Sequence, residues 1–329
     1  MRAYEIYQKY EEPNRFQTST QKKVERALAT AEKEGLAPSQ EALDLRDDYE
    51  SQVEALKHTG ILEQLSGGEL GIHGIDGREY HIPNYEEVER HMSERREALK
   101  TKIEQGFTKL LLVPFGMSLD TLAEKYKETI LKHHSQGKLF ATKKEPTDPD
   151  VPLELDTNQP LWIWDEYKGA DQSGKLVYNP KEFSQNHGGK TKTELLGTDA
   201  GWRILLIEDM PNIPRQNQGK TLGTRPQLEA NMTPRQYLEK LGLDSYKDEV
   251  GMTPEDQLTY TIIHLETTNQ VIDDYQGNGS VSYQIGAYFP ASERVPGAYW
   301  DRAYRQAYLA GNGADARGEG VGVRSAVRV

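Results

Sequence analysis

Apolar and polar residues recur with two different periods along the chain. Between residues 18 and 91, apolar residues stand three or four positions apart among charged ones, as in TQKKVERALATAEKEG, and this spacing predicts amphipathic helices. A turn over residues 35–39 would join two of them into a hairpin. We expect these helices to pack on the chain that follows. A dimerising coiled coil is the alternative, although the heptads are short.

Glycine spacing and continuous apolar runs predict strands. Closely spaced glycines over residues 64–84 predict a small hairpin, and the apolar run over residues 110–115 predicts a buried strand. Ser118 then stands where it would N-cap a helix. A second apolar run, over residues 202–207, predicts another buried strand, which the prolines after it bring to an end.

Two helices in the C-terminal half begin with the same signal. Thr233 and Thr253 each precede a proline and stand three residues before a side chain that can complete a capping box. We expect the second helix to run to about Tyr275, with Asp273 and Asp274 at its C-terminal end. The stretch SVSYQIGAYF predicts an alternating strand, and the final GVGVRSAVRV predicts a half-buried strand that closes the domain.

The order of these elements predicts an α+β fold in three parts. Residues 1–105 form a mainly helical N-terminal region, and residues 106–150 form a strand, a helix and a proline-rich acidic linker. Residues 151–329 form the C-terminal domain. Its last strand is expected to pair back toward the start of that domain.

Composition narrows the classes of function. The formal net charge of -12 disfavours binding to nucleic acid or to an anionic membrane surface. The chain has no cysteine, which excludes disulfides, cysteine nucleophiles and thiolate metal sites. No stretch approaches the roughly 20 apolar residues that span a bilayer, so no membrane insertion is expected. Without an export signal, cytoplasmic residence is the default expectation, and surface display stays open.

Acidic residues are the main candidates for catalysis, because the nucleophile-elbow, Walker, HExxH and EF-hand motifs are absent. Glu208 and Asp209 directly follow a predicted buried strand, and Asp273 and Asp274 lie at a predicted helix end, where carboxylates oppose the helix dipole. Either pair could act as a general base or bind a cation, and structural hydrogen bonding is the competing interpretation. His187, beside two glycines and two lysines, could belong to an anion-binding loop. No cofactor or metal site is predicted, because the histidines of the hairpin have no partner at ligand spacing.

The C-terminal stretch VPGAYWDRAYRQAYLAGNGADARGEGVGVRSAVRV has the composition of a recognition surface. It contains no lysine and mixes small, acidic and arginine residues with Tyr299, Tyr304 and Tyr308. Tyrosine gives a large amphipathic contact at small entropic cost, while Gly, Ala and Asn give adaptability, as in antibody paratopes. An ordinary irregular loop followed by a strand is the alternative interpretation.

The segments SYQIGAYFPAS, YWDRAYRQA and GVGVRSAVRV resemble the variable proteins of diversity-generating retroelements. The C-type-lectin-like domain of that family, of the formylglycine-generating type, ends in a G-[VF]-R strand. The resemblance covers roughly residues 106–329 and implies a variable region at about 297–329. Without cysteine, the oxidase chemistry of formylglycine-generating relatives is excluded. The calcium-ligand tripeptides of sugar-binding lectins are also missing.

The resemblance also implies which residues vary. Adenine-directed mutagenesis in that family turns AAY codons into NNY codons, which encode Tyr, Asp, Asn, Ala, Gly, Ser and Val but never Lys, Glu, Gln, Met or Trp. The implied diversified, ligand-binding positions are Tyr299, Asp301, Ala303, Tyr304, Tyr308, Ala310, Asn312 and Val321. The implied scaffold of the variable region is Trp300, Arg302, Arg305, Gln306 and Arg324.

These observations together predict a non-enzymatic ligand-binding protein. Its diversified face would bind an unknown protein ligand, and the N-terminal helices would position it or join it into a homo-oligomer. No nucleic-acid partner is expected. Two alternatives stay open: an enzyme of unknown type that uses Glu208, Asp209, Asp273 and Asp274, and a structural subunit of a virion or other assembly.

Overall fold

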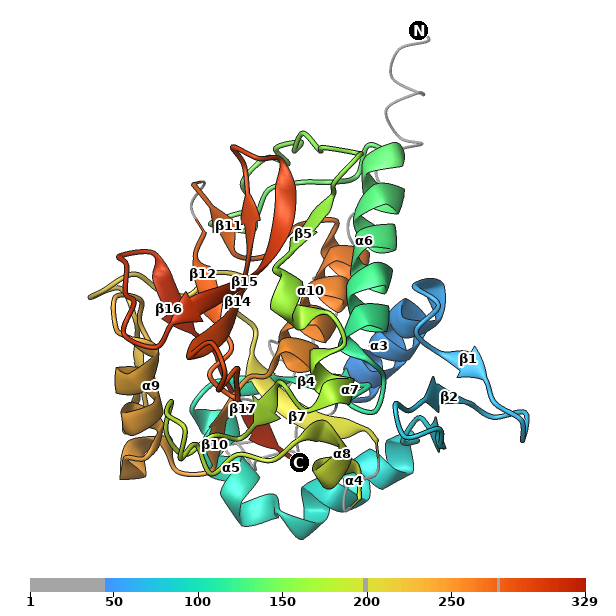
Figure 1. Cartoon of the computed structure of the whole chain (residues 1–329), viewed down its shortest axis with the longest axis horizontal. Helices are drawn as coiled ribbons and strands as arrows, with labels where there is room; N and C mark the ends of the chain where they lie inside the picture. The colour runs from blue at the N-terminus through green and yellow to red at the C-terminus, as the bar shows by residue number, and fades with distance from the viewer. Residues whose placement is uncertain (1–44, 198–200, 277–278) are drawn as a thin grey trace, which may run out of the picture. The chain divides into compact units, whose positions relative to one another are not determined.

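The computed structural model describes residues 45–197, 201–276 and 279–329 (Figure 1). The helices predicted between residues 18 and 44 lie outside this described part. Residues Leu45–Val329 form one compact unit, in which helices are mixed with several β-sheets. The α+β class is therefore confirmed.

The first described elements are a helix, a small sheet and two further helices. The small sheet is antiparallel and follows chain order, so the hairpin predicted from the glycine spacing is confirmed. Asn84 and Glu87 form a capping box at the start of the helix that follows the sheet. The elements are α3 (Arg46–His58), β1 (Glu63–Gln64), β2 (Leu70–His73), β3 (Glu79–His81), α4 (Tyr85–Glu94) and α5 (Arg96–Glu104).

Four strands from distant parts of the chain form an antiparallel sheet. In spatial order they are β10 (Glu249–Gly251), β17 (Ser325–Arg328), β7 (Arg203–Glu208) and β4 (Phe107–Val113). The strands predicted over residues 110–115 and 202–207 are thus confirmed, and they are neighbours. Both are buried along most of their length, as their continuous apolar runs require.

This sheet differs in two respects from the predicted organisation. The final strand pairs with β7 and β10 and not with the start of the 151–329 region. A position between two other strands buries its apolar residues Ala326 and Val327 completely. In addition, β4 precedes residue 150 yet lies beside β7. Residues 106–150 therefore share a compact unit with the C-terminal residues, and the proline-rich stretch does not separate two units.

Helix α3 covers the edge strand β4. Gln52 Nε2 donates to the carbonyl of Leu110 at 2.6 Å, and the N–H of Leu112 donates to Gln52 Oε1 at 3.0 Å. Asp48 Oδ2 accepts the N–H of Leu110 at 2.9 Å. Two helical side chains therefore supply the hydrogen bonds that a further strand would make, and they satisfy backbone groups that burial would otherwise leave unpaired.

A second large sheet contains the C-terminal hairpin. Within it β14 and β15 are antiparallel, β5 joins β15 in parallel, and β11 lies beside β14. Its strands, in spatial order, are β16 (Val321–Val323), β12 (Val281–Tyr283), β14 (Arg294–Asp301), β15 (Gln306–Gly313) and β5 (Leu161–Ile163), with β11 (Asp274–Tyr275) off this path. Two small sheets pair β6 (Val177–Tyr178) with β13 (Ala287–Tyr288) and β8 (Thr221–Leu222) with β9 (Arg225–Pro226).

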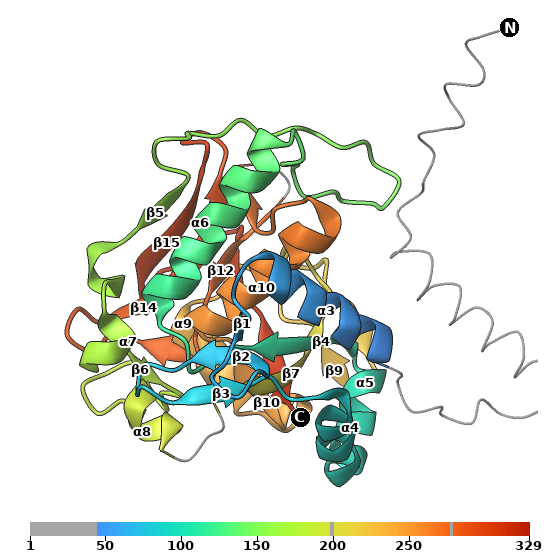
Figure 2. The ribbon, with the colours of Figure 1, turned by 90° about the vertical axis from the view of Figure 1, so that its right-hand side faces the viewer.

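The buried helix α10 (Pro254–Thr268) connects the two large sheets. It packs beside α6 (Leu119–Ser135) and contacts both β4 and β14, and every residue from Pro254 to Leu265 is buried (Figure 2). A helix that is covered on all sides forms the centre of a core. The remaining short helical segments are η1 (Asp165–Tyr167), α7 (Ala170–Ser173), α8 (Lys192–Leu196), α9 (Pro234–Leu241) and η2 (Asp244–Tyr246).

The predicted helix starts are confirmed, whereas one predicted helix end is wrong. Ser118, Thr233 and Thr253 accept the expected backbone N–H bonds at the starts of α6, α9 and α10. However, α10 ends at Thr268 and not near Tyr275, because Asn269 adopts a left-handed conformation with φ of 61° and caps the helix. Asp273 and Asp274 therefore lie beyond the helix: Asp273 is in a bend with a left-handed φ of 53°, and Asp274 begins the strand β11.

The strand predicted from SVSYQIGAYF is interrupted and does not alternate. It forms β12 and β13, and the residues from Ser280 to Phe289 are all buried. The interruption falls at Gly286, where a Cβ atom would lie 2.2 Å from the carbonyl oxygen of Gly251. This close approach of two backbone segments takes the place of a continuous ladder.

Candidate functional site

The β14–β15 hairpin displays aromatic side chains on one face. Tyr299 is opposite Tyr308 across the hairpin, and Tyr308 is opposite Trp162 of β5 on its other side. Residues directly opposite each other in a sheet point to the same face, so these three rings lie together. Tyr275 of β11 and Tyr304 of the hairpin turn complete the group. We call Trp162, Tyr275, Tyr299, Tyr304 and Tyr308 the tyrosine face.

The rings of the tyrosine face contact one another in sequence. Ring centroids are 5.1 Å apart for Trp162 and Tyr308, and 5.0 Å apart for the stacked pair Tyr308 and Tyr299. Tyr275 packs edge-on to Tyr299 at 5.6 Å, and Tyr304 lies 6.0 Å from Tyr308. All four separations fall in the range of about 4.5–7 Å typical of favourable aromatic pairs. The result is a continuous aromatic layer that spans β5, β15, β14 and β11.

The two faces of the hairpin differ in exposure. Tyr304 is 63% exposed and Tyr275 37% exposed, and the other members of the tyrosine face are half-buried. On the opposite face, Ala298, Trp300 and Leu309 are buried in the core. The hairpin therefore fixes its position with one face and leaves aromatic surface accessible on the other.

The central tyrosine of this layer stays protonated at neutral pH. Partial burial, together with the nearby Asp301 carboxylate and the neighbouring tyrosines, raises the pKa of Tyr299 to about 12. Burial also raises the pKa of Tyr308 above its ordinary value. The hydroxyl groups of Tyr299 and Tyr308 therefore stay protonated at neutral pH and can donate hydrogen bonds to a ligand.

The other predicted variable positions are distributed unequally. Ala310 and Asn312 are half-buried and follow Tyr308 on the same face of β15, whereas Ala303 is exposed in the turn. Val321 is half-buried on β16, at the far edge of the sheet from β5, so it lies apart from the tyrosine face.

Asp301 has a structural position. Its side chain is buried, and its Oδ1 accepts the N–H groups of Ala303 and Tyr304 at 2.8 and 3.1 Å. This carboxylate therefore holds the hairpin turn in shape. A change at Asp301 would disturb the turn that carries Tyr304, which is not what a freely variable contact residue would do.

The predicted scaffold residues have mixed environments. Trp300, Gln306 and Arg324 are buried, and Gln306 Nε2 donates to the hydroxyl of Tyr308 at 2.9 Å. Arg302 forms an ion pair with Asp274 at 2.5 Å. Arg305 is exposed, and its φ of 55° places it in the left-handed region within the turn.

The four acidic residues of the enzyme alternative each pair with a cation. Glu208 binds Arg225 at 3.0 Å, and Asp209 lies 3.3 Å from Lys109. Asp274 is held by Arg302, as described above, and Asp273 binds a buried arginine of the final segment. Each of the four carboxylates therefore has a counter-charge. Asp209 and Asp273 both lie close enough to the buried Tyr260 to contribute to its raised pKa. A small cavity behind the tyrosine face is lined by Asp273 but not by Glu208 or Asp209.

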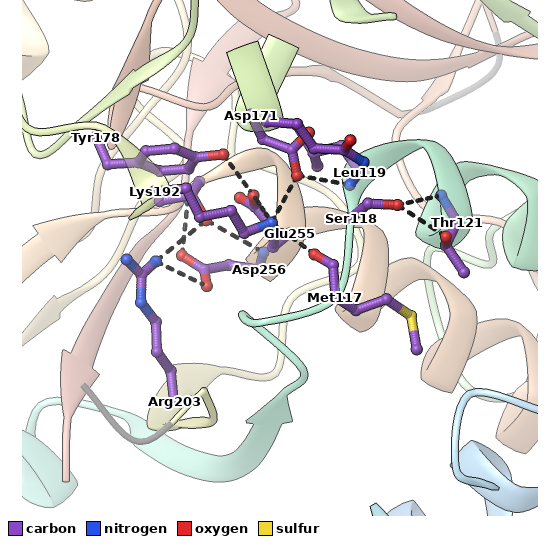
Figure 3. A network of polar contacts seen from close by, with 12 residues as sticks. Met117, Ser118, Leu119, Thr121, Asp171, Tyr178, Lys192, Arg203, Glu255 and Asp256 are labelled. Carbon is purple, nitrogen blue, oxygen red and sulfur yellow. Dashed lines mark hydrogen bonds and ion pairs between the residues drawn. The ribbon is translucent and has the colours of Figure 1, made fainter. Parts of the chain in front are cut away.

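A buried charge network lies elsewhere in the fold, and no motif or spacing in the sequence predicted it. Lys192 Nζ lies 2.8 Å from Asp171 Oδ2 and 3.0 Å from Glu255 Oε1, and it donates to the carbonyl of Met117 at 2.6 Å (Figure 3). Tyr178 donates to Glu255 Oε1 at 2.6 Å. The three charged side chains are completely buried. A substrate could not reach these side chains. Their structural effect is to join α7, α8 and the start of α10.

The same network braces two helix starts. The N–H of Leu119, in the first turn of α6, donates to Asp171 Oδ2 at 2.9 Å. Asp256, next to Glu255 in α10, lies 3.7 Å from Arg203, and burial raises the pKa of its carboxyl group. In the sequence these residues look ordinary, because Asp171 precedes a glycine by three residues and Lys192 stands in a polar stretch after two glycines and another lysine. Only tertiary contacts bring them together.

Comparison of the chain with models of protein families, with curated proteins and with solved structures finds no match. Within the described ranges, no group of three or more His, Asp or Glu side chains is arranged to hold a metal ion. Among the same residues, no helix is both long enough and apolar enough to cross a membrane.

Proposed function

We propose that the protein is a non-enzymatic ligand-binding protein and that the tyrosine face contacts its partner. The observation that carries this proposal is the contiguous aromatic layer on the accessible face of a hairpin whose other face is packed in the core. Tyrosine and tryptophan, together with arginine, are enriched among the residues that carry most of the binding energy at protein interfaces. Contiguous aromatic surface of this kind on a folded unit is typical of a recognition site for another protein.

The rigidity of the layer supports the same function. The rings of Trp162, Tyr299 and Tyr308 are held by one another and by the sheet, so little of their side-chain freedom remains to be lost on binding. The hydroxyl groups of Tyr299 and Tyr308, which stay protonated at neutral pH, add directional hydrogen bonds to a surface that is otherwise apolar. Such a face fits a protein ligand better than a small molecule, because the cavity that Tyr299 and Tyr308 line has a volume of only about 10 Å³.

The proposal includes diversification of this face by a retroelement, on a C-type-lectin-like fold. Its support is the match between accessibility and coding. Tyr299, Tyr304 and Tyr308, which NNY codons encode, lie on the tyrosine face, whereas Trp300 and Gln306, which NNY codons cannot encode, are buried. Asp301 is the exception, because it is encodable and buried, and we therefore propose that it is held constant.

The experiment is to sequence codons 297–329 in many clones from the source population, together with the DNA just downstream. Substitutions confined to adenines of a nearby near-repeat, and concentrated at Tyr299, Tyr304 and Tyr308, would support diversification. An invariant tail with no repeat would refute it and would leave the enzyme and assembly alternatives in equal standing. Light scattering on the purified chain tests the assembly alternative, which requires a defined oligomer.

A further inference from the structure

A surface cavity of about 410 Å³ lies away from the tyrosine face, near the end of the four-stranded sheet. Five parts of the chain meet there: β6, the glycine-containing loop after it, α8 and the sheet strands β10 and β17. The lining residues are Tyr178, Asn179, Gly188, Lys190, Leu195, Val250 and Arg328. The volume falls within the range of about 300–1,000 Å³ that is usual for small-molecule sites.

The charge of this lining has a single sign. Lys190 and Arg328 contribute two cations, and no Asp or Glu lines the cavity. The whole chain, by contrast, carries 52 acidic and 40 basic residues. A cleft lined by one sign of charge with low-dielectric walls concentrates ions of the opposite sign. This cavity is therefore suited to attract an anion to a protein that otherwise repels anions.

The polar groups come from segments that the fold holds together. Lys190 and Tyr178 exchange backbone hydrogen bonds at 3.0 and 2.8 Å, which fixes the loop against β6. Arg328 Nη2 donates to Asn179 Oδ1 at 2.9 Å, which orients the guanidinium group from the opposite wall. The two cations are thus positioned from separate elements, and a bound anion would connect them.

The remaining wall is apolar. Leu195 and Val250 form it, and they are buried and half-buried respectively. Tyr178 is completely buried and offers a ligand no exposed surface, and its hydroxyl is bound to Glu255 in the buried charge network (Figure 3). An inorganic ion alone would leave this apolar wall in contact with water, whereas an apolar body attached to the anion would cover it.

We propose that this cavity binds a small organic anion: a carboxylate or phosphate ester attached to an apolar, ring-sized body. Lys190 and Arg328 bind the oxyanion, and Leu195 and Val250 contact the ring. The site is separate from the tyrosine face and does not depend on the function proposed for that face. The loop after β6, which contains His187, would then be an anion-binding loop, as the sequence suggested, and its residues Gly188 and Lys190 line the cavity.

The test uses the full chain at low salt and follows binding by ligand-observed NMR titration. The probes are benzoate and phenyl phosphate as aromatic anions, benzyl alcohol as a neutral analogue, and inorganic phosphate as an anion without a ring. Both aromatic anions should bind more tightly than benzyl alcohol and inorganic phosphate. The ratio of their affinities distinguishes a carboxylate site from a phosphate-ester site.

Substitutions locate the binding. Lys190→Gln and Arg328→Gln should each weaken binding of the aromatic anions about tenfold, because each removes a charge-assisted hydrogen bond. Lys168→Gln removes an exposed lysine outside the cavity and should leave binding unchanged. Equal binding of benzyl alcohol, equal binding of inorganic phosphate, unchanged affinity in both cavity variants, or no binding of any probe would each overturn the proposal.

Discussion

Arg324 binds Asp273 through two parallel hydrogen bonds, with Nη1 donating to Oδ2 at 2.7 Å and Nη2 to Oδ1 at 2.9 Å. The two side chains are 3% and 1% exposed. The same guanidinium group also donates to the carbonyls of Met210 and Pro211. One residue between the last two strands therefore joins the loop after β7 to the segment after α10.

This pair predicts a large cost for removing one charge. Asp273→Asn should lower the free energy of unfolding by about 3–5 kcal/mol, because it leaves a buried guanidinium group without its counter-charge. Urea denaturation measures the change. The double variant with Arg324→Met should cost clearly less than the sum of the two single variants. Additive costs would contradict the assigned pairing.

The tyrosine face predicts different effects for its members. Tyr304→Ala should change the free energy of unfolding by less than about 0.5 kcal/mol, because that side chain is 63% exposed. Tyr308→Ala should cost about 1–3 kcal/mol, because its ring contacts three other rings. Thermal and urea unfolding would compare them, with Tyr308→Phe as the control that keeps the stack. Equal losses at positions 304 and 308 would contradict the geometry.

His264 predicts a specific sensitivity to acid. Burial, with the positive charge of Lys109 nearby, lowers its pKa from 6.5 to about 3. Between pH 6.5 and 3 the imidazole of His264 is therefore protonated in the unfolded state and neutral in the folded state. The free energy of unfolding is unaffected by this group above about pH 6.5, and it falls as the pH is lowered toward 3, by up to about 1.4 kcal/mol per pH unit.

The matching variant is His264→Leu, because neither ring nitrogen of His264 has a hydrogen-bond partner among the described residues. At neutral pH the variant should be at least as stable as the parent protein. Between pH 6.5 and 3 it should lose less stability than the parent. Parallel pH curves of the two proteins would show that His264 does not titrate in this way.

The buried charge network predicts a contrast between two nearby lysines. Lys192→Met leaves Asp171 and Glu255 buried without their cation and should cost more than about 3 kcal/mol. Lys190→Met makes the same chemical change at an exposed position and should leave stability within about 0.5 kcal/mol. Urea denaturation measures both changes. Equal losses in the two variants would contradict the buried pairing.

Local signals predicted the parts of the fold that local energies decide. The caps at Ser118, Thr233 and Thr253 are each complete within four residues, and continuous apolar runs identified β4 and β7. The end of α10 was missed because the helical spacing of apolar residues continues past Asn269. The helix ends there only because Asn269 adopts the left-handed conformation, which the spacing does not reveal.

The candidate site was predictable only in part. Composition singled out Tyr299, Tyr304 and Tyr308, but it could not add Trp162 and Tyr275. Trp162 reaches the tyrosine face because β5 pairs with β15, more than a hundred residues further along the chain. Tyr275 reaches it because the separate strand β11 pairs with β14. The structural role of Asp301 was also hidden, because a turn and a contact surface favour the same residue types. Pairing between distant strands is a tertiary property that periodicity does not report.

The cover that Gln52 and Asp48 provide over β4 bears on how the molecule behaves at high concentration. A second molecule cannot extend the four-stranded sheet at this edge, because the outward N–H and carbonyl of Leu110 and the N–H of Leu112 are already engaged. Association through this edge has to wait until a helix of 13 residues detaches. Resistance to fibrillar aggregation on this side is therefore governed by how often α3 opens, and not by the surface charge of the strand.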